Sequence, residues 1–154
     1  MKHLQFLLCL LFLTMSIPAS AQTKRNVNPV YIANMLVDNI SLDEMRETCL
    51  FYNLKEISSD DGYMTFIDAR GNTIRFKDAG NREIGANGRL IELHTRDNIK
   101  TIERILKDTG YRKQADVYER GARITNSLTQ CQLRSKGQFR MLSFHKVKNK
   151  RVED

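Results

Sequence analysis

The 154-residue chain carries 25 lysines and arginines against 18 aspartates and glutamates, for a formal net charge of +7. This length is enough for one domain with a substantial core and too short for two. The positive charge favours anionic partners, such as an acidic protein, a phosphate-bearing glycolipid or an acidic polysaccharide, although a charge of this size also simply keeps a small domain soluble.

Residues 1–21 have the pattern of a secretory signal peptide. Lys2 precedes an apolar run over residues 6–12, and Ala19-Ser20-Ala21 supplies the small residues of a cleavage site. The apolar run is shorter than the roughly 20 residues that a membrane anchor needs. We therefore expect cleavage near Ala21, a mature domain of residues 22–154 in the periplasm or outside the cell, and no transmembrane segment after processing.

Two helices are predicted before the first strand. Asn28-Pro29 is a typical helix start, because proline at the first helical position lacks only an N–H that has no partner there. This helix is expected to run to about Ile40. Ser41 and Glu44 then form a capping box, which begins a second helix that ends near Asn53.

The segment of residues 97–110 has the clearest helical periodicity in the chain. Its apolar residues recur at helical spacing and predict one buried stripe: Ile99, Ile102, Ile105 and Leu106. We expect Asp97 to cap the start of this helix and Gly110 to end it in the left-handed conformation.

The other segments have the two-residue periodicity typical of strands. Predicted strands cover residues 54–57, 63–68, 73–77, 89–95, 111–118, 122–134 and 138–148. A three-residue loop, residues 69–71, pairs Phe66 with Ile74 and Met64 with Phe76, so that four large apolar side chains share one face.

A second three-residue loop, residues 135–137, is predicted in the last hairpin. It pairs Leu133 with Phe139 and Cys131 with Met141, which again gives a coherent apolar face. In this register Phe139 belongs to the core and Arg140 faces solvent.

The order helix, strand, strand, strand occurs twice, over residues 41–96 and 97–148, with an additional strand in the first unit and a charged tail at residues 149–154. The sequence therefore predicts a single α+β domain: an antiparallel sheet built from two helix-plus-three-strand repeats, with the helices packed on one face. In element order these units resemble β-lactamase inhibitory protein and related periplasmic modules. The resemblance implies a binding or inhibitory surface on the exposed sheet face and no catalytic site.

The main functional hypothesis is a non-enzymatic binding module that uses this exposed face. The face is expected to present basic side chains to a protein or to an anionic component of the cell envelope: Arg75, Lys77, Arg134 and Arg140. The same residues also fit an ordinary solvated face. Nucleic acid is not favoured as a partner, because Phe66, Phe76 and Phe139 fall on the predicted core face and cannot stack on bases.

The alternative hypothesis is a small secreted ribonuclease-type phosphodiesterase. Glu92 and His94 share one face of a strand, and His145 lies near the end of another. A carboxylate or histidine base with a histidine acid is the pair that such chemistry needs. No motif fixes the separation of these residues, so a non-enzymatic protein is favoured.

Cys49 and Cys131 remain in the mature chain, and both fall on predicted core positions. In an oxidising compartment they form either a disulfide or two separate buried thiols. The two histidines of the mature chain have no metal-ligand spacing to each other or to the cysteines, so no metal or other cofactor is expected.

Overall fold

The computed structural model describes residues 27–38, 41–60, 62–78, 89–121 and 127–148. In these residues the chain is an α+β protein with three helices and eight strands. In chain order the elements are α2 (Pro29–Leu36), α3 (Leu42–Phe51), β1 (Lys55–Asp60), β2 (Tyr63–Ile67), β3 (Thr73–Asp78), β4 (Arg89–Thr95), α5 (Ile99–Asp108), β5 (Arg112–Gln114), β6 (Val117–Gly121), β7 (Ser127–Lys136) and β8 (Phe139–Lys148). The predicted signal peptide lies outside the described residues, and within them no helix has the length and apolarity needed to cross a membrane.

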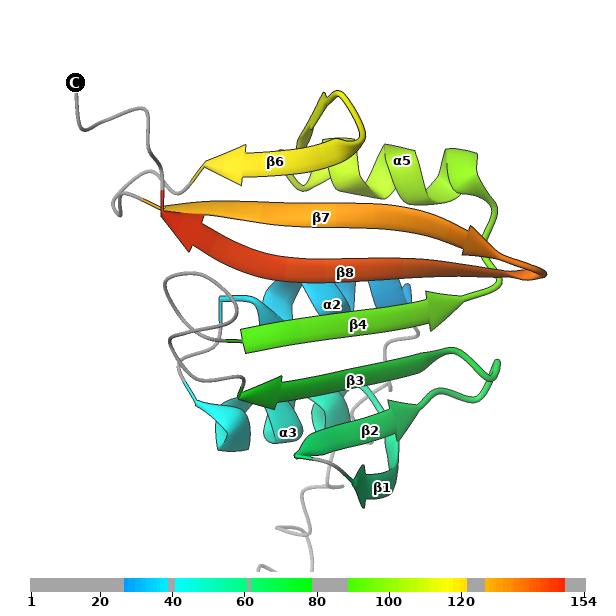
Figure 1. Cartoon of the computed structure of the whole chain (residues 1–154). Helices are drawn as coiled ribbons and strands as arrows, with labels where there is room; N and C mark the ends of the chain where they lie inside the picture. Colours follow the sequence, from blue (N-terminus) through cyan, green and yellow to red (C-terminus); the bar gives the residue numbers. More distant parts are fainter. Residues whose placement is uncertain (1–26, 39–40, 61, 79–88, 122–126, 149–154) are drawn as a thin grey trace, which may run out of the picture.

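All eight strands belong to one antiparallel sheet in the order β1-β2-β3-β4-β8-β7-β6-β5 (Figure 1). The chain enters at the β1 edge and reaches the centre at β4. It then passes through α5 to the opposite edge and returns from β5 to β8, which lies beside β4. Two consecutive four-strand meanders therefore meet at the β4–β8 pair.

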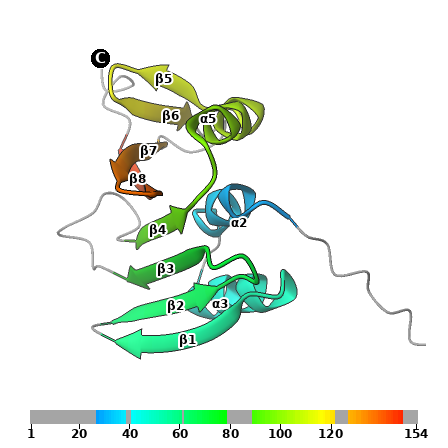
Figure 2. The same cartoon turned by 90° about the vertical axis from the view of Figure 1, so that its right-hand side faces the viewer.

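Alternate strand residues define two faces of the sheet. On the first, which we call the buried face, the following side chains have no exposed surface: Phe66, Ile74, Phe76, Ile91, Leu93, Cys131, Leu142 and Phe144. Helix α2 contacts β4, α3 and α5, and it lies between α3 and α5 in the side view of Figure 2. The residues that alternate with the buried ones form the opposite face, which we call the open face.

The first hairpin confirms the predicted register. Phe66 lies opposite Ile74 and Met64 opposite Phe76. The loop closes through Gly71, whose φ of +80° is the left-handed conformation that glycine adopts without strain. The sequence pattern of this hairpin was therefore sufficient to assign its buried residues.

The predicted register of the last hairpin is wrong by one residue on β8. Lys136 lies opposite Phe139, so the loop contains two residues, with Gly137 at a φ of +59°. Two-residue loops with positive φ match the twist of the flanking strands. The core pairs are instead Leu133 with Leu142 and Cys131 with Phe144.

This one-residue difference exchanges the two faces of β8. Phe139 and Met141 alternate with the buried Leu142 and therefore lie on the open face, contrary to the prediction. Arg140, which was expected to face solvent with the other basic residues, lies on the buried face. The register that buries both Leu142 and Phe144 removes more apolar area from water than the predicted one, which explains the preference.

The predicted strand of residues 111–118 is in fact a turn between two strands. β5 and β6 are joined through Ala115, which has a φ of +51°, and Asp116. The predicted turn at residues 119–121 lies within β6 instead. As a result, four strands rather than three follow α5. No glycine or asparagine occurs at the turn to signal it in the sequence.

The helix ends agree with the predictions except at one cap. Ser41 and Glu44 form the capping box of α3, and Gly110 follows α5 with a φ of +91°. Helix α5 is capped by Asn98 rather than by Asp97, because the Asn98 side chain accepts a hydrogen bond from the Thr101 amide at 2.8 Å. The predicted end of the first helix, beyond the end of α2 at Leu36, falls partly outside the described residues.

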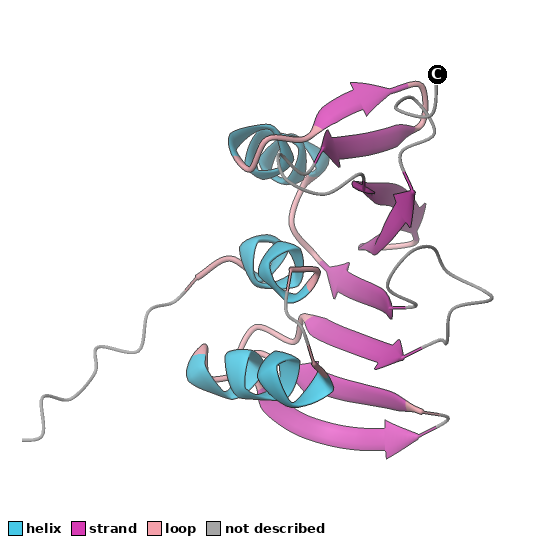
Figure 3. Cartoon of the chain, turned by 90° about the vertical axis from the view of Figure 1, so that its left-hand side faces the viewer, coloured by secondary structure: helices cyan, strands magenta, loops and turns pink. Residues whose placement is uncertain are grey.

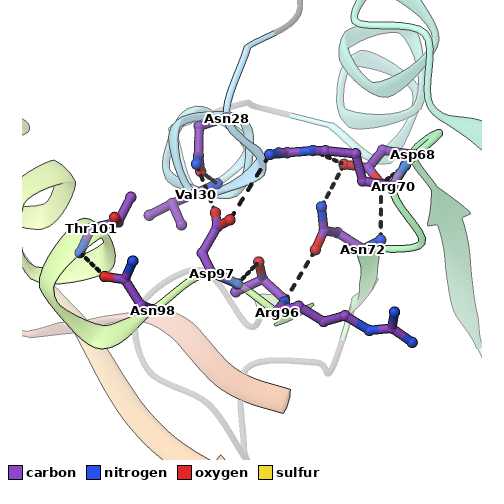
Figure 4. A network of polar contacts seen from close by, with 10 residues as sticks. Asn28, Val30, Asp68, Arg70, Asn72, Arg96, Asp97, Asn98 and Thr101 are labelled. Atoms are coloured by element: carbon purple, nitrogen blue, oxygen red, sulfur yellow. Dashed lines mark hydrogen bonds and ion pairs between the residues drawn. The ribbon is translucent and has the colours of Figure 1, made fainter. Parts of the chain in front are cut away.

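Asp97 instead belongs to a polar network at one end of the sheet (Figure 4). It accepts a hydrogen bond of 2.7 Å from the side chain of Asn28, the N-cap of α2. Arg70, in the β2–β3 loop, lies 3.9 Å from Asp97 and 3.6 Å from Asp68. Asp68 also accepts a bond from the Asn72 side chain at 2.7 Å. These contacts tie the start of α2 to the β2–β3 loop and to the segment that leads into α5.

Candidate binding face of the sheet

The open face carries five of the basic and histidine side chains singled out in the sequence. Arg75 and Lys77 come from β3, His94 from β4, Arg134 from β7 and His145 from β8. Their positions alternate with buried residues on each strand. Because the strands are paired in one sheet, these side chains form rows across the same surface.

The first cluster on this face surrounds Tyr63 on β2. The guanidinium carbon of Arg75 lies 4.7 Å from the centre of the Tyr63 ring, and the Lys77 ammonium lies 4.9 Å from it. Arg75 also forms an ion pair with Glu92 on β4, whose side chain is only 13% exposed. Glu92 therefore neutralises Arg75, whereas Lys77 has no carboxylate within ion-pair distance among the described residues.

A second cluster lies at the other end of the same rows, near the β7–β8 hairpin. The Arg96 guanidinium carbon lies 5.1 Å from the centre of the Phe139 ring. Lys136 is opposite Phe139, and Arg134 is opposite Met141. We call these five residues the Phe139 cluster. The sequence-based analysis assigned Phe139 and Met141 to the core and did not single out Arg96 or Lys136; a two-residue loop at Gly137-Gln138 was the available signal.

Both histidines of the open face favour the neutral form. Burial lowers the pKa of His94, and the positive charge of Arg75 lowers it further. The Nε2 atom of His94 is buried and has no hydrogen-bond partner in the described structure. Burial also lowers the pKa of His145. The positive charge of this face at neutral pH therefore comes from lysine and arginine.

The residues of the phosphodiesterase hypothesis do not converge on one point. His94 lies opposite Met141 on β8, so His145 is four residues further along that strand. At about 3.4 Å per residue this is a separation of about 13 Å, whereas an acid and a base acting on one substrate atom each need hydrogen-bond reach of about 3 Å. Glu92, the third residue, is held by Arg75.

Arg140 is not part of the open face, in contrast to the prediction. On the buried face its Nη1 donates hydrogen bonds to the carbonyl oxygens of Gly137 and Phe139, at 3.3 and 3.2 Å. Its Nε is buried without a partner in the described structure. The side chain therefore braces the end of the β7–β8 hairpin and cannot meet a ligand on the opposite surface.

Cys49 and Cys131 are two separate buried thiols, and no disulfide joins them. Cys49 is in α3, which contacts β1, whereas Cys131 is in β7. β7 lies five strand spacings from β1 in the sheet order, or about 24 Å. Burial raises the pKa of Cys49 to about 12, with a further contribution from the Glu56 carboxylate, and burial likewise raises the pKa of Cys131. Such thiols are poor nucleophiles at neutral pH.

Within the described residues, no three histidine, cysteine, aspartate or glutamate side chains gather in a way that fits a metal ion. The open face is thus defined by two clusters in which cations lie against aromatic rings. A scan against protein-family models finds no match, and searches of curated proteins and of solved structures find none either.

Proposed function

We propose that this chain is a secreted or periplasmic binding module that docks an acidic protein surface on the open face of its sheet. The observation that carries the proposal is the presence of two cation–aromatic clusters on one face, around Tyr63 and around Phe139. Tyrosine, arginine and methionine side chains of this kind are enriched at protein–protein interfaces, and lysine at their rim supports recognition of negative charge.

The charge of the two clusters favours an acidic partner over a neutral one. Glu92 neutralises Arg75 alone. Lys77, Arg96, Arg134 and Lys136 have no ion pair within the described structure. Charge complementarity of this sort mainly accelerates association and selects against basic partners.

We further propose that the fold consists of two repeats, each a helix followed by four strands. Helices α3 and α5 both have ten residues, and a shift of 57 positions superimposes their N-caps, Ser41 and Asn98. Both are followed by a residue with positive φ, Asn53 and Gly110. The next amide then bonds back into the helix in each case, from Leu54 to the Cys49 carbonyl and from Tyr111 to that of Leu106.

The proposal includes packing of all three helices on the buried face, which leaves the open face accessible. Support comes from Figures 2 and 3, in which α2, α3 and α5 lie to the same side of the strands. A two-repeat sheet with one free face is the arrangement implied by the resemblance to β-lactamase inhibitory protein, and a role in binding or inhibiting another protein is part of this proposal.

Site-specific photo-crosslinking tests the binding role. A photoreactive amino acid at Met141, on the open face, should capture a protein from envelope extract, whereas the same group at the exposed Asp116, in the β5–β6 turn, should not. Reversal of charge in Lys77→Glu/Lys136→Glu should abolish capture at position 141, and raised salt should weaken it. Equal capture at both positions, or capture that survives the charge reversal, would contradict the proposal.

Anionic lipid vesicles provide the second arm of this experiment. Binding to vesicles that contain a phosphate-bearing lipid, lost in the same charge-reversed variant, would replace the protein partner with an envelope component. Absence of both kinds of binding would refute the role of the open face.

A further inference from the structure

The outward side of helix α3 exposes large apolar side chains. Leu50 is 47% exposed and Phe51 is 64% exposed. Phe51 also forms one wall of a groove of about 580 Å³ between α2 and α3, whose other lining residues are Met35, Glu44, Glu47, Thr48 and Tyr52. Exposed apolar surface of this kind next to a groove is typical of a docking site.

The outward side of α5 is different in character. Its buried residues are Ile102, Ile105 and Leu106. Lys100, Arg104 and Lys107 follow one another at helical spacing on the side opposite to them, and all three are exposed. We call these three residues the α5 ridge. In the described structure none of them has an ion pair.

The corresponding ridge of α3 carries the complementary side chains. The 57-residue shift that superimposes the two helices places Asp43 on Lys100, Glu47 on Arg104 and Leu50 on Lys107. All three α3 residues are exposed. Equivalent outward positions of two helices of equal length are therefore acidic and apolar in α3 but basic in α5.

We infer from this complementarity that the chain forms a two-fold symmetric dimer, in which α3 of each copy docks on the α5 ridge of the other. The inference rests on the one-sided helix packing proposed above, and it does not depend on the binding role of the open face. Helix α2 lies between α3 and α5 (Figures 2 and 3). A two-fold axis that passes over α2 therefore brings both α3–α5 contacts together at once, and the assembly closes at two copies.

The chemistry of the two ridges fits such a contact. Glu47 and Arg104 are the middle residues of their ridges, so they oppose each other whether the helices run parallel or antiparallel. The aliphatic stems of Lys100 and Lys107 can cover Leu50, and their ammonium groups can lie over the face of Phe51. Because the helices meet, the open faces of both copies remain available for a partner.

Analytical ultracentrifugation of the mature chain, residues 22–154, tests this inference. The wild-type protein should pass from monomer to dimer as concentration rises. Glu47→Lys and Arg104→Glu should each weaken dimerisation by about tenfold or more, because each places like charges in contact at both interfaces. The matched control is Arg112→Glu, an exposed charge reversal on the β5 edge, which should leave dimerisation unchanged.

A mixture of the two weakened variants provides the decisive measurement. In a heterodimer of Glu47→Lys with Arg104→Glu, the lysine introduced in one chain would meet the glutamate introduced in the other at one contact. The native Glu47–Arg104 pair would form at the second contact. Dimers should therefore return on mixing, and also in the doubly substituted chain. A monomer at every concentration, species larger than a dimer, or no recovery on mixing would overturn the inference.

The same variants separate this inference from the proposed function. Lys77→Glu/Lys136→Glu should dimerise normally while losing the crosslink at position 141. Phe51→Ser should lose dimerisation while retaining that crosslink. Loss of both properties in either variant, with an unchanged circular dichroism spectrum, would mean that the two surfaces are not independent.

Discussion

The contact between Asn28 and Asp97 fixes the first helix to the rest of the domain, and its removal has an effect that can be worked out. In Asn28→Ala, α2 loses the side-chain oxygen that accepts the Val30 amide at 2.9 Å, which costs about 1 kcal/mol. Asp97 loses a hydrogen bond to a charged group, worth about 1.5–3 kcal/mol. The Asp97 side chain is 19% exposed, so water replaces part of that bond. We expect the free energy of unfolding to fall by about 2–3 kcal/mol in total.

Urea unfolding followed by circular dichroism measures this change. The midpoint should move to lower urea with an unchanged slope, and the melting temperature should fall by roughly 6–12 °C. Asn98→Ala is the matched control, since it removes the cap of α5 without touching Asp97. It should cost only about 1 kcal/mol.

A double-mutant cycle isolates the long-range part of the effect. Asn28→Ala and Asp97→Ala should show a coupling energy of about 1–2 kcal/mol, because each single change already removes the shared hydrogen bond. If the two effects add without coupling, the contact contributes nothing to stability and the reasoning from the network of Figure 4 is wrong.

Three further predictions follow from burial. Cys49 and Cys131 should not react with a thiol reagent at pH 8 in the folded protein and should both react in urea, because burial holds both pKa values high; fast reaction in the folded state would contradict this. The lowered pKa values of His94 and His145 mean that the unfolded chain takes up protons first, near its ordinary value of 6.5. The free energy of unfolding should therefore fall as the pH drops below about 6.5 and level off below the folded pKa values, and the double substitution to glutamine should flatten this profile in melting experiments. Phe66→Ala should lower the free energy of unfolding by about 3–5 kcal/mol in urea titrations, since Phe66 is fully buried and stacks on Phe76 at 5.6 Å between ring centres; a loss below about 1 kcal/mol would place it outside the core.

Much of the fold follows from local signals in the sequence. The capping box at Ser41, the glycines at positions 71 and 110, and the alternation around Phe66 each determine a structure within a few residues of themselves. Such signals act over short distances, so one sequence suffices to read them. The α+β class follows because these elements change from helical to strand periodicity in a fixed order.

The features that were predicted wrongly depend on competition between similar alternatives. At the last hairpin both registers bury large apolar residues, Phe139 and Met141 in one and Leu142 and Phe144 in the other. Propensity does not separate them, and the choice requires the packing of the whole buried face. The turn at Ala115 was missed because a non-glycine residue occupies a positive-φ position there.

The candidate site was only partly accessible for the same reason. Arg75 and Lys77 lie on the predicted face because their strand was assigned correctly. Arg140 was wrongly included and the Phe139 cluster was wrongly excluded, since both depend on β8. The ion pair of Arg75 with Glu92 connects neighbouring strands, and no sequence pattern indicates that it removes Glu92 from acid–base chemistry.

The register of β8 therefore determines the core and the candidate binding face together. A slip of one residue would return Phe139 and Met141 to the core and would expose Leu142 and Phe144, at a cost of about 1.5–3 kcal/mol for each apolar side chain left in water. The packing of the buried face thus fixes which side chains of β8 a partner meets. It follows that charged residues of the open face, such as Lys77 and Lys136, can be reversed without disturbing the pairs that hold the sheet. Loss of binding in those variants would then report on recognition and not on folding.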